Sequence, residues 1–497
     1  MAKKVASGDR KNLKIIFTGG VSGFDELSWG LSNALKDRVD IESYFLSFNE
    51  KNRHLFRSKG VPEKNILELD LIKWRDEEID IEYIKKIEEK YGEPNLNIFW
   101  PSVRRAEKFS HEEELKMFQC YTKLYESIFG EIKPDFIVNY GVASLSLVVL
   151  NRVAEVNNIP NLILYNSKVP DRFVIHRGLK NQWQKVDDAF RELKEKGLKE
   201  SERKTASEFL SAFRNKGLFV TYANLNIKRQ KSIIPRIRSL LRLYYQIYRF
   251  GLFKTSHLRE RNIFMPFEYT FDRLKVETRR RLVKKLNIFD KPNYDEKYVF
   301  FPLHVQPEAS TLVWAPFFLD QIEIINNISK SVPIDCFVYV KEHPANIGRR
   351  KLEYYRELKR NANVRLLSPW ENTQDLILNS SIVITITGTV GWEAIIWEKP
   401  VITLGNVFYN TFDLVKHVTD YTKMPFVISD TIKDYMPDRE LLLKYITANI
   451  KESYLGIPLA PYNCNHFSMS EENLKNLANG LANHIDKYYR KLDLTPA

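Results

Sequence analysis

Short apolar runs alternate with amphipathic segments between Tyr298 and Leu404, and this alternation limits the folds open to the chain more than any other feature. The runs that predict strands are residues 298–303, 336–341, 364–366, 382–386 and 401–404, and the segments that predict helices are 314–329, 349–361, 373–379 and 391–398. Strands that alternate with helices are typical of a parallel sheet with right-handed crossovers. The sequence therefore predicts a Rossmann-like lobe in this region.

The N-terminal part of the chain shows the same alternation. Its first predicted strand, 13–18, closes on Gly19-Gly20 and is followed by an amphipathic helix over 25–35. Further runs predict strands at 41–46, 136–139 and 162–165, with a helix at 144–157 between the last two. A strand, a tight turn and a helix are typical of the opening of a Rossmann-like unit. We therefore expect an α/β protein with two such lobes facing a central cleft.

The length of the chain agrees with two lobes. With 497 residues and 44% hydrophobic content, it exceeds what a single core usually supports. From about residue 182 to 290 the pattern changes to long, charged helices, which predicts a helical insertion. The expected organisation is a first lobe over 1–290 that includes this insertion, a second lobe over 291–450 and a helical tail over 451–497. The helix of the tail, 470–489, is expected to cross back onto the first lobe.

The three cysteines, Cys120, Cys336 and Cys464, are far apart and share no metal-ligand spacing. They indicate neither a disulfide framework nor a zinc site, and a reducing compartment fits them best. The apolar stretch 13–17 is too short for the core of a signal peptide, and other apolar runs fall far short of the roughly 20 residues of a membrane helix. The sequence therefore predicts a soluble, cytoplasmic protein.

The formal net charge of +13 admits nucleic acid, an anionic membrane surface or anionic small substrates as partners. Much of the excess lies between Lys228 and Lys291. No recognised nucleic-acid-binding module accompanies it. We therefore expect a local basic surface and no nucleic acid partner.

The sharpest local motif is residues 381–393, in which an apolar strand ends in the Thr-Gly-Thr loop 387–389 and a helix opens at Gly391. In a doubly wound sheet, ligands bind outside the carboxyl ends of the strands, and a helix N-terminus offers free N–H groups to a phosphate. Glu393 can accept hydrogen bonds from ribose hydroxyls, or it is simply an acidic residue of the kind favoured near helix N-termini. The motif predicts a phosphate site.

Lys341 and His343 follow the predicted strand 336–341, and Pro344 ends that strand. His343 can donate a hydrogen bond to a phosphate and stabilise the negative charge that develops on a leaving group, which would make it catalytic. Lys341 is a weaker candidate for the same task. The alternative for His343 is a satisfied or surface histidine with no ligand.

A third polar loop follows the strand 298–303 and contains His304, Gln306 and Glu308 between two prolines. At the edge of the sheet these side chains would line the cleft between the lobes and bind a sugar or its phosphate. The alternative is a polar, proline-rich loop at a domain junction. Trp370 can stack near a base, although an aromatic residue in such a loop is more often packing.

Three segments resemble the capsule polysaccharide biosynthesis family: PLHVQPEAST, the Lys-x-His-Pro that begins at Lys341, and TGTVGWEAIIWEKPVITLG. The resemblance covers about residues 295 to 410. That family includes Kdo transferases of capsule export, and it implies a glycosyltransferase of the GT-B architecture. In it, and in the similar sialyltransferases and glycerophosphotransferases, a His-Pro pair and a Ser/Thr-rich loop with Glu contact a cytidine nucleotide donor.

Carried over by motif, the resemblance implies a CMP-sugar donor site that includes His343, Thr387, Thr389 and Glu393. The full set of expected donor-binding residues is His304, Gln306, Glu308, Lys341, His343, Thr387, Gly388, Thr389 and Glu393. The sugar would be Kdo-like or a nonulosonic acid, and the acceptor a surface glycan or lipid-linked glycan. No metal or other cofactor is implied, because helix N-termini, His and Lys can meet the phosphates. A UDP-sugar transferase or epimerase and a noncatalytic glycan-assembly protein remain alternatives.

An inverting transfer needs a carboxylate or histidine that takes the proton of the acceptor hydroxyl, and in this architecture it normally comes from the N-terminal lobe. Asp25 and Glu26, just after the first glycine turn, are the best-placed acids, with Asp25 preferred. The alternative for Asp25 is capping of the helix that it begins. Asp171 and His176, near another strand end, form the rival pair.

Residues 235–253 place apolar side chains on one helical face and arginines outside it. This pattern suits the headgroup region of an anionic membrane, where a lipid-linked acceptor would be found. Packing against the first lobe explains the apolar face equally well. We therefore expect a cytoplasmic protein, with contact to the inner face of the cell membrane as one alternative.

Overall fold

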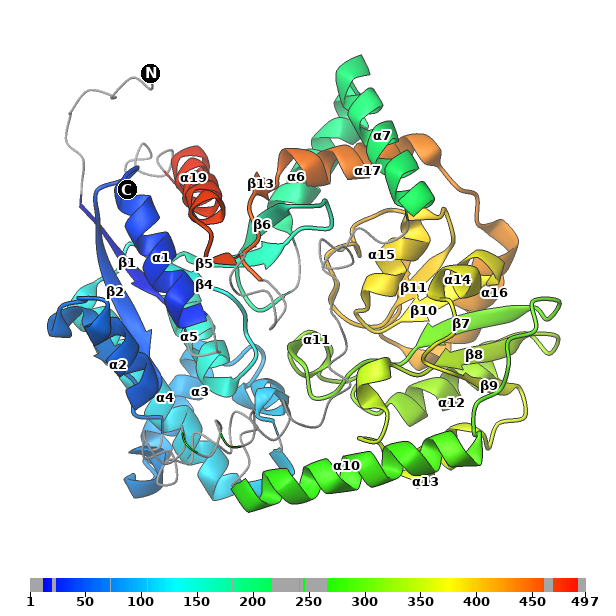
Figure 1. The fold of residues 1–497 in the computed structure, drawn as a ribbon, viewed down its shortest axis with the longest axis horizontal. Helices are drawn as coiled ribbons and strands as arrows, with labels where there is room; N and C mark the ends of the chain where they lie inside the picture. The colour runs from blue at the N-terminus through cyan, green and yellow to red at the C-terminus, as the bar shows by residue number, and fades with distance from the viewer. Residues whose placement is uncertain are drawn as a thin grey trace.

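The computed structural model describes residues 12–19, 24–71, 73–104, 106–180, 183–216, 241, 245, 266–459 and 468–489. Two α/β lobes lie side by side, each around its own sheet (Figure 1). No helix within these described ranges is long and apolar enough to cross a bilayer.

The first lobe is built on a seven-stranded sheet in the order β13-β6-β5-β4-β1-β2-β3. Its strands are β1 (Leu13–Phe17), β2 (Ile41–Ser47), β3 (Ile66–Glu68), β4 (Phe136–Asn139), β5 (Asn161–Asn166), β6 (Arg172–His176) and β13 (Tyr454–Leu455). β1 to β5 are parallel, whereas β6 and β13 run antiparallel to their neighbours at one edge. Helices cover both faces of the parallel part, so most of its strand residues are buried, and all four residues of β4 are.

The second lobe has a six-stranded, fully parallel sheet in the order β12-β11-β10-β7-β8-β9. Its strands are β7 (Tyr298–Pro302), β8 (Phe337–Lys341), β9 (Val364–Leu367), β10 (Ile382–Thr385), β11 (Val401–Thr403) and β12 (Val415–His417). In both sheets the first strand of the lobe lies between its second and its fourth, which is the doubly wound Rossmann order. The predicted pair of Rossmann-like lobes is confirmed.

Helices cover both sheets. The first lobe carries α1 (Phe24–Lys36), α2 (Glu50–Ser58), α3 (Ile81–Tyr91), α4 (His111–Ile132) and α5 (Leu145–Val156). The second carries α11 (Ala309–Leu312), α12 (Gln321–Ser331), α13 (Leu352–Leu358), α14 (Thr373–Asn379), α15 (Thr389–Ile396) and α16 (Met424–Asp434). The 3-10 helices are η1 (Glu63–Asn65), η2 (Lys73–Asp76), η3 (Leu96–Ser102), η4 (Ala106–Lys108), η5 (Pro344–Asn346) and η6 (Tyr421–Lys423).

The predicted helix 314–329 is wrong in its first half. The chain forms the short α11 before it, runs through an irregular segment, and begins α12 at Gln321. Pro316 lies in the irregular segment and cannot donate to a helix ladder. Asp320 caps α12 by accepting hydrogen bonds from the N–H groups of Ile322 and Glu323, which fixes where that helix begins.

The described part of the predicted helical segment 182–290 comprises α6 (Gln184–Lys196), α7 (Glu200–Lys216) and α10 (Pro266–Leu286). α6 and α7 pack against α17 (Arg439–Lys451). Their buried side chains, such as Phe190 and Phe213, share one hydrophobic cluster with Trp392 of the second lobe. The guanidinium of Arg214 donates to the carbonyl of Ile396, so α7 is tied to the end of α15.

The chain returns to the first lobe at its C-terminal end. α19 (Glu471–Tyr488) packs on α1, where a Cβ on Gly30 would lie 2.9 Å from Leu474. Leu477 and Leu481 are buried in the core of the first lobe. The predicted return of the C-terminal helix is confirmed.

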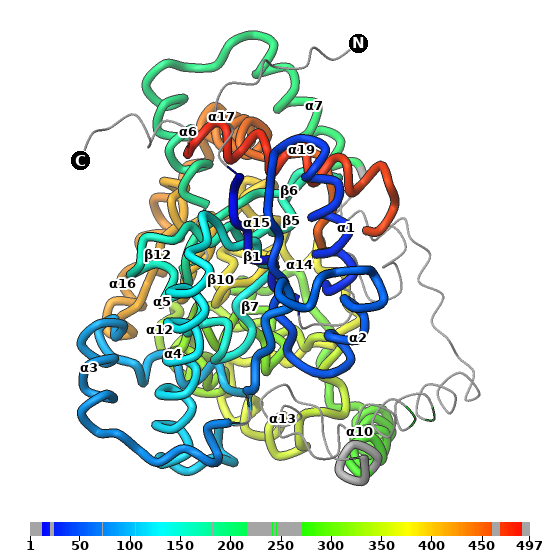
Figure 2. Tube along the Cα trace, turned by 90° about the vertical axis from the view of Figure 1, so that its left-hand side faces the viewer, coloured from blue at the N-terminus to red at the C-terminus, as the bar shows by residue number. Residues whose placement is uncertain are grey.

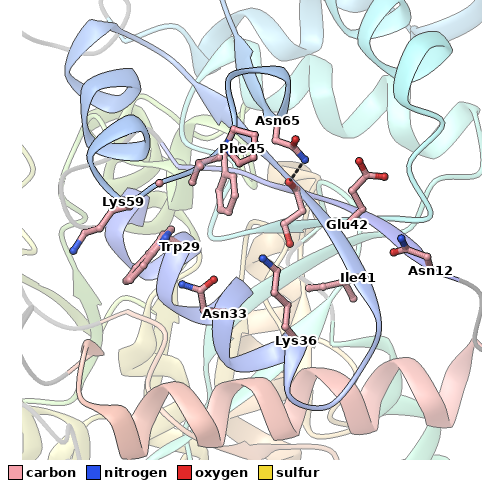
Figure 3. Close-up of a pocket in the computed structure, with 13 residues that line it drawn as sticks. Asn12, Trp29, Asn33, Lys36, Ile41, Glu42, Phe45, Lys59 and Asn65 are labelled. Atoms are coloured by element: carbon pink, nitrogen blue, oxygen red, sulfur yellow. Dashed lines mark hydrogen bonds between the residues drawn. The ribbon is translucent and has the colours of Figure 1, made fainter.

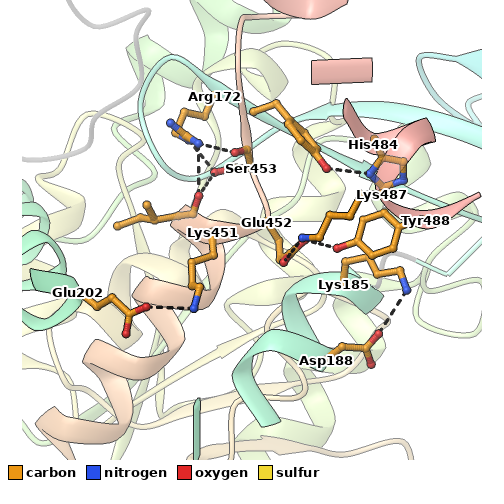
Figure 4. Close-up of polar contacts among 12 residues, drawn as sticks. Arg172, Lys185, Asp188, Glu202, Lys451, Glu452, Ser453, His484, Lys487 and Tyr488 are labelled. Carbon is orange, nitrogen blue, oxygen red and sulfur yellow. Dashed lines mark hydrogen bonds and ion pairs between the residues drawn. The ribbon is translucent and has the colours of Figure 1, made fainter. Parts of the chain in front are cut away.

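Polar contacts hold the segment around β13 and helix α19 against the first lobe (Figure 4). Arg172 of β6 donates through Nε to the hydroxyl of Ser453 at 2.8 Å. The adjacent Glu452 accepts from Nζ of Lys487 at 2.8 Å and from the hydroxyl of Tyr488. The strand β13 is therefore linked both to the sheet edge and to α19.

Candidate functional site

His304 lies where the second sheet switches direction, because it follows β7 and faces the end of the neighbouring β10. Its Nε2 accepts a hydrogen bond from the backbone N–H of Thr387 at 3.2 Å and lies 3.3 Å from the hydroxyl of Thr385. Burial lowers the pKa of the imidazole to about 4, and the charges of His343 and Arg350 lower it further. His304 is therefore neutral near pH 7, and its Nε2 joins two loops of the site.

The Thr-Gly-Thr loop is held on several sides. The hydroxyl of Thr387 donates to the carbonyl of Ser310 at 2.7 Å, and the N–H of Gly388 donates to the hydroxyl of Thr385 at 3.0 Å. Gly388 is the N-cap of α15, and Thr389 is the exposed first residue of that helix. The first N–H groups of α15 thus stand at the carboxyl edge of the sheet, as an anion site requires.

Close packing beneath this loop leaves room only for glycine at position 391. A Cβ on Gly391 would lie 2.2 Å from the hydroxyl of Tyr409. That hydroxyl donates to the carbonyl of Gly388 and so fixes the start of α15 from below.

Glu393 is buried in the first turns of α15, with only 6% of its surface exposed. Burial raises the pKa of its carboxyl to about 8, and the charges of Lys168 and Lys341 oppose this rise. Lys168 belongs to the first lobe and follows β5, whereas Lys341 ends β8 of the second lobe. Burial lowers the pKa of the Lys168 ammonium to about 8, and the Glu393 charge opposes this shift. Lysine side chains from both lobes thus act on the carboxyl of Glu393.

Lys341 and His343 lie at the carboxyl end of β8. The Lys341 Nζ donates to the hydroxyl of Thr373 at 2.5 Å, and burial lowers its pKa. His343 is exposed, and its Nδ1 accepts from the N–H of Ala345 at 3.1 Å. The neutral ring therefore carries its proton on Nε2, where it can be donated to a ligand. Burial of part of the ring and the charges of Lys341 and Arg350 lower the His343 pKa.

Three residues that the sequence analysis did not single out, Glu342, Asn346 and Arg350, support these loops. Glu342 is 1% exposed, and its carboxylate lies 3.2 Å from Nε of Arg350. Arg350 also donates to the carbonyl of His304 at 2.8 Å, and Asn346 donates to the same carbonyl at 3.1 Å. The burial of Glu342 could have been predicted from the sequence. Side chains alternate along an extended chain, so Glu342 points inward if its neighbours Lys341 and His343 point outward.

Gln306 and Glu308 occupy different positions in their loop. The Gln306 amide donates to the carbonyl of Leu319 at 2.8 Å and accepts from Gln321 at 2.9 Å, so both ends of it hold the loop. Glu308 is exposed just before α11. Burial of part of its carboxyl raises the Glu308 pKa, and the charge of Arg104 from the first lobe opposes that rise. Trp370 lies at the surface with 61% exposure.

In the first lobe, Asp25 lies at the corresponding position after β1. Its carboxylate is 5% exposed and accepts from the amide of Asn52 at 2.6 Å. A Cβ on Gly19 would lie 2.0 Å from Asp25 Oδ1, so the strand end needs glycine there. Glu26, the next residue, is exposed. The turn residues 20–23 lie outside the described ranges.

The structure places the two alternative candidates for the general base, Asp171 and His176, in different surroundings. Asp171 is exposed in the turn after β5, with a φ of 56°. His176 ends the antiparallel β6 and pairs with Ile163 in the middle of β5, away from the carboxyl edge. Burial lowers the His176 pKa to about 4. The structure therefore brings together the second-lobe candidates and Lys168, and it places His176 elsewhere.

A pocket of about 440 Å³ lies on the first lobe, between α1, β2 and the segment before β3 (Figure 3). Trp29 and Lys36 of α1 line it, together with Lys59 and the first residues of β2. It therefore opens near the amino end of β2, whereas the candidate site occupies the carboxyl ends of strands.

Among the side chains within the described ranges, no group of three or more His, Cys, Asp or Glu residues could hold a metal ion. The amphipathic segment 235–253 falls outside these ranges except for Leu241 and Tyr245, which are exposed.

Comparison with known proteins agrees with the resemblance predicted from the sequence. Residues 242–425 match the model of a family described as capsule polysaccharide biosynthesis protein. The matched segment contains His304, His343 and Glu393. Protein FixF of Sinorhizobium fredii (strain NBRC 101917 / NGR234) is 31% identical over 156 residues, which are 30% of this chain and 36% of that protein. The chain thus matches little more than a third of that relative's length.

Solved structures with similarity to the chain include two KpsC transferases of Thermosulfurimonas dismutans. The beta Kdo 2,7 transferase is 14% identical, with 73% of this chain and 89% of that chain covered and a TM-score of 0.36. The beta Kdo 2,4 transferase is 13% identical, with 68% and 88% covered and a TM-score of 0.35. S. aureus MnaA, solved with UDP, is 12% identical, with 98% and 99% covered and a TM-score of 0.28. These similarities are distant.

Proposed function

We propose that this chain, whose residues 242–425 match the model of the capsule polysaccharide biosynthesis family, is a GT-B glycosyltransferase that uses a CMP-sugar donor. The observation that carries the proposal is the set of ionisable side chains at the carboxyl edge of the second sheet. Glu393 is buried there in the first turns of α15, and the charges of Lys168 and Lys341 act on its carboxyl. This edge is the usual ligand position in a doubly wound sheet.

In the proposed complex, the donor phosphate lies against the N-terminus of α15. Thr389 and the N–H groups of the first turn bind its oxygens, and His343 donates through Nε2 to the leaving phosphate. Lys341 adds a positive charge at the same edge. Glu393 binds ribose hydroxyls, and near pH 7 its carboxyl can also donate a hydrogen bond because its pKa is raised to about 8.

Three of the predicted residues are proposed to hold the loops of the site in position: His304, Gln306 and Thr387. His304 holds Thr387 through its Nε2, and Gln306 holds the loop after β7. We propose that Glu308 contacts the sugar directly. Its side chain is exposed, and while burial of part of its carboxyl raises the pKa, the charge of Arg104 from the first lobe lowers it. Gly388 contributes backbone only.

Asp25 is the proposed general base. It lies after β1, where the first sheet switches direction between β1 and β4. The hydroxyl of Thr18 and the side-chain oxygen of Asn139 meet there at 2.8 Å, so the two strand ends are joined as in the second lobe. Glu26 is the exposed alternative on the same helix turn.

The proposed sugar is Kdo-like or a nonulosonic acid, in keeping with the Kdo transferases named above. The acceptor is a surface glycan or lipid-linked glycan, and transfer takes place on the cytoplasmic side of the membrane. Residues 235–253 are proposed to contact that membrane.

A thermal-shift panel tests the donor nucleotide. CMP, CDP, UMP, UDP and GDP are added separately to the wild type, to His343→Ala and to His111→Ala, which removes an exposed histidine of the first lobe. A ligand that binds only the folded state raises the melting temperature by mass action. We expect CMP or CDP to stabilise the wild type and His111→Ala, and His343→Ala to lose most of the effect.

Stabilisation by UDP alone would replace the CMP donor with a UDP-sugar. No response to any nucleotide would contradict the transferase proposal as a whole. If His343→Ala and the wild type respond equally to CMP, the nucleotide binds elsewhere and the proposed role of His343 is wrong.

A further inference from the structure

An exposed apolar stripe runs along α10. Phe271, Leu274, Leu282 and Leu286 are 60%, 60%, 40% and 52% exposed. With Thr278 between them, they recur every three or four residues and therefore lie on one helical face. A monomeric soluble protein rarely leaves such a continuous stripe in water without a use for it.

Basic side chains accompany the stripe. Helix α10 contains seven Lys and Arg residues and three Asp and Glu residues. Lys275, Lys284 and Lys285 are exposed, and Arg281 has 81% of its side chain in solvent. The exposed face of α10 is therefore both apolar and positively charged.

A second face of α10, next to the stripe, is anchored to the second lobe. Val283 is 2% exposed in the core of that lobe, and a Cβ on Gly348 would lie 2.2 Å from the carbonyl of Val276. Arg279 donates to the carbonyl of Arg349 at 3.3 Å. The helix is thus held firmly on one side, and its apolar stripe cannot turn inward.

The helix lies at the margin of the molecule. Figure 1 shows α10 along the lower edge, below both lobes, and Figure 2 shows it end-on, outside the body of the sheets and their helices. Helix α10 therefore lies at the outside of the described part of the molecule.

We infer that the exposed face of α10 binds the surface of an anionic lipid bilayer. Leucine and phenylalanine side chains enter the boundary between headgroups and acyl chains, while the flanking lysines and arginines meet lipid phosphates. This inference is separate from the membrane contact proposed for residues 235–253, and it does not depend on sugar transfer.

The composition of the face favours lipid over other partners. Lysine is depleted at the cores of protein interfaces, whereas the exposed Lys275 and Lys285 lie beside the apolar residues of this stripe. Nucleic acid binds through charge and base contacts and would gain little from a row of exposed leucines. An anionic bilayer uses both kinds of side chain.

Co-sedimentation of the full chain with vesicles tests the inference. The vesicles are made of phosphatidylcholine alone or mixed with phosphatidylglycerol. We expect binding to the mixed vesicles, weakened by salt. Phe271→Ser with Leu274→Ser should reduce the binding constant at least about tenfold. Replacing Lys275, Arg281 and Lys285 by Gln should reduce it about a hundredfold, at about fivefold per charge.

Matched controls separate this face from general charge and hydrophobicity. Lys416→Gln, Lys423→Gln and Lys433→Gln together remove the same net charge from exposed positions elsewhere. Phe426→Ser with Met436→Ser removes two apolar side chains that are 71% and 77% exposed. Both control proteins should bind the mixed vesicles as the wild type does.

Three results would overturn the inference. The first is equal binding by the α10 variants and the wild type. The second is a dimer in sedimentation velocity that Phe271→Ser with Leu274→Ser dissociates, because the stripe then faces a second copy. The third is absence of vesicle binding together with a lower melting temperature in that variant, because the stripe then packs on protein. None of these results bears on the nucleotide panel, so the two proposals fail independently.

Discussion

The backbone N–H of Thr387 donates to Nε2 of His304 across 3.2 Å, and this bond joins the loop after β10 to the loop after β7. The carbonyl of His304 in turn accepts from Asn346 and Arg350, which belong to the segment after β8. One residue thus links three loops of the candidate site. Burial lowers the pKa of the His304 imidazole to about 4. The ring is therefore neutral near pH 7, and its Nε2 can accept the hydrogen bond from Thr387.

Replacement of His304 by Ala should destabilise the protein by about 1–3 kcal/mol, because the buried N–H of Thr387 loses its acceptor. His304→Gln should recover part of this loss, since its amide oxygen can accept in place of Nε2. Urea unfolding measures both. The explanation is wrong if Ala and Gln cost the same.

Glu393→Gln should stabilise the protein in alkaline solution while removing donor binding. The folded carboxyl has a pKa of about 8 and the unfolded one about 4.5, so stability is fully present below 4.5 and is lost as the pH rises towards 8. Gln does not titrate. The gain should therefore be close to zero at low pH and reach the order of a few kcal/mol at about pH 8.

Unfolding of both proteins across this pH range tests the point, with the exposed Glu353→Gln as a control that should follow the wild type. A stability difference between Glu393→Gln and the wild type that stays constant with pH would mean that Glu393 is already ionised in the folded protein.

Gly391→Ala should lower the melting temperature and weaken nucleotide binding, because its Cβ would lie 2.2 Å from the hydroxyl of Tyr409. The double variant with Tyr409→Phe should recover part of the stability, since the nearest clashing atom is gone. Gly130→Ala serves as the control. A Cβ there meets nothing within 4 Å, and alanine in a helix should stabilise by roughly 0.5–1 kcal/mol. Equal effects at positions 391 and 130 would contradict the packing argument.

Leu481→Ala should destabilise the first lobe by about 2–5 kcal/mol, because Leu481 is fully buried where α19 meets α1. Leu455→Ala, at a position that is 54% exposed in β13, should change stability by less than about 0.5 kcal/mol. Chemical unfolding followed by tryptophan fluorescence compares the two. Comparable losses would show that α19 contributes little to the core.

Strands β7 to β11 of the second sheet could be predicted almost to the residue, because strands buried on both faces are continuous apolar runs. β10 is predicted at 382–386 and found at Ile382–Thr385. The edge strands β3, β12 and β13 carry no such signal, since each has only two or three residues and at most one of them is buried. β6 was missed because its antiparallel pairing interrupts the parallel pattern.

The candidate site also has parts that could be predicted from the sequence and parts that could not. Loops at the carboxyl ends of β7, β8 and β10 could be predicted, because a parallel sheet brings those ends together. The use of the His304 ring as an acceptor could not, since it depends on the order of strands β7 and β10. Lys168 was missed because only the juxtaposition of the lobes brings it near Glu393.

The return of the chain through β13 and α19 has a consequence for folding during synthesis. The first sheet obtains its edge strand and the cover of α1 only after the entire second lobe has left the ribosome. The hydrophobic face of α1 that receives Leu474 and Leu481 is therefore exposed on the nascent chain throughout that interval. Domains generally fold in the order in which they emerge, so here the lobe that is made first is completed last.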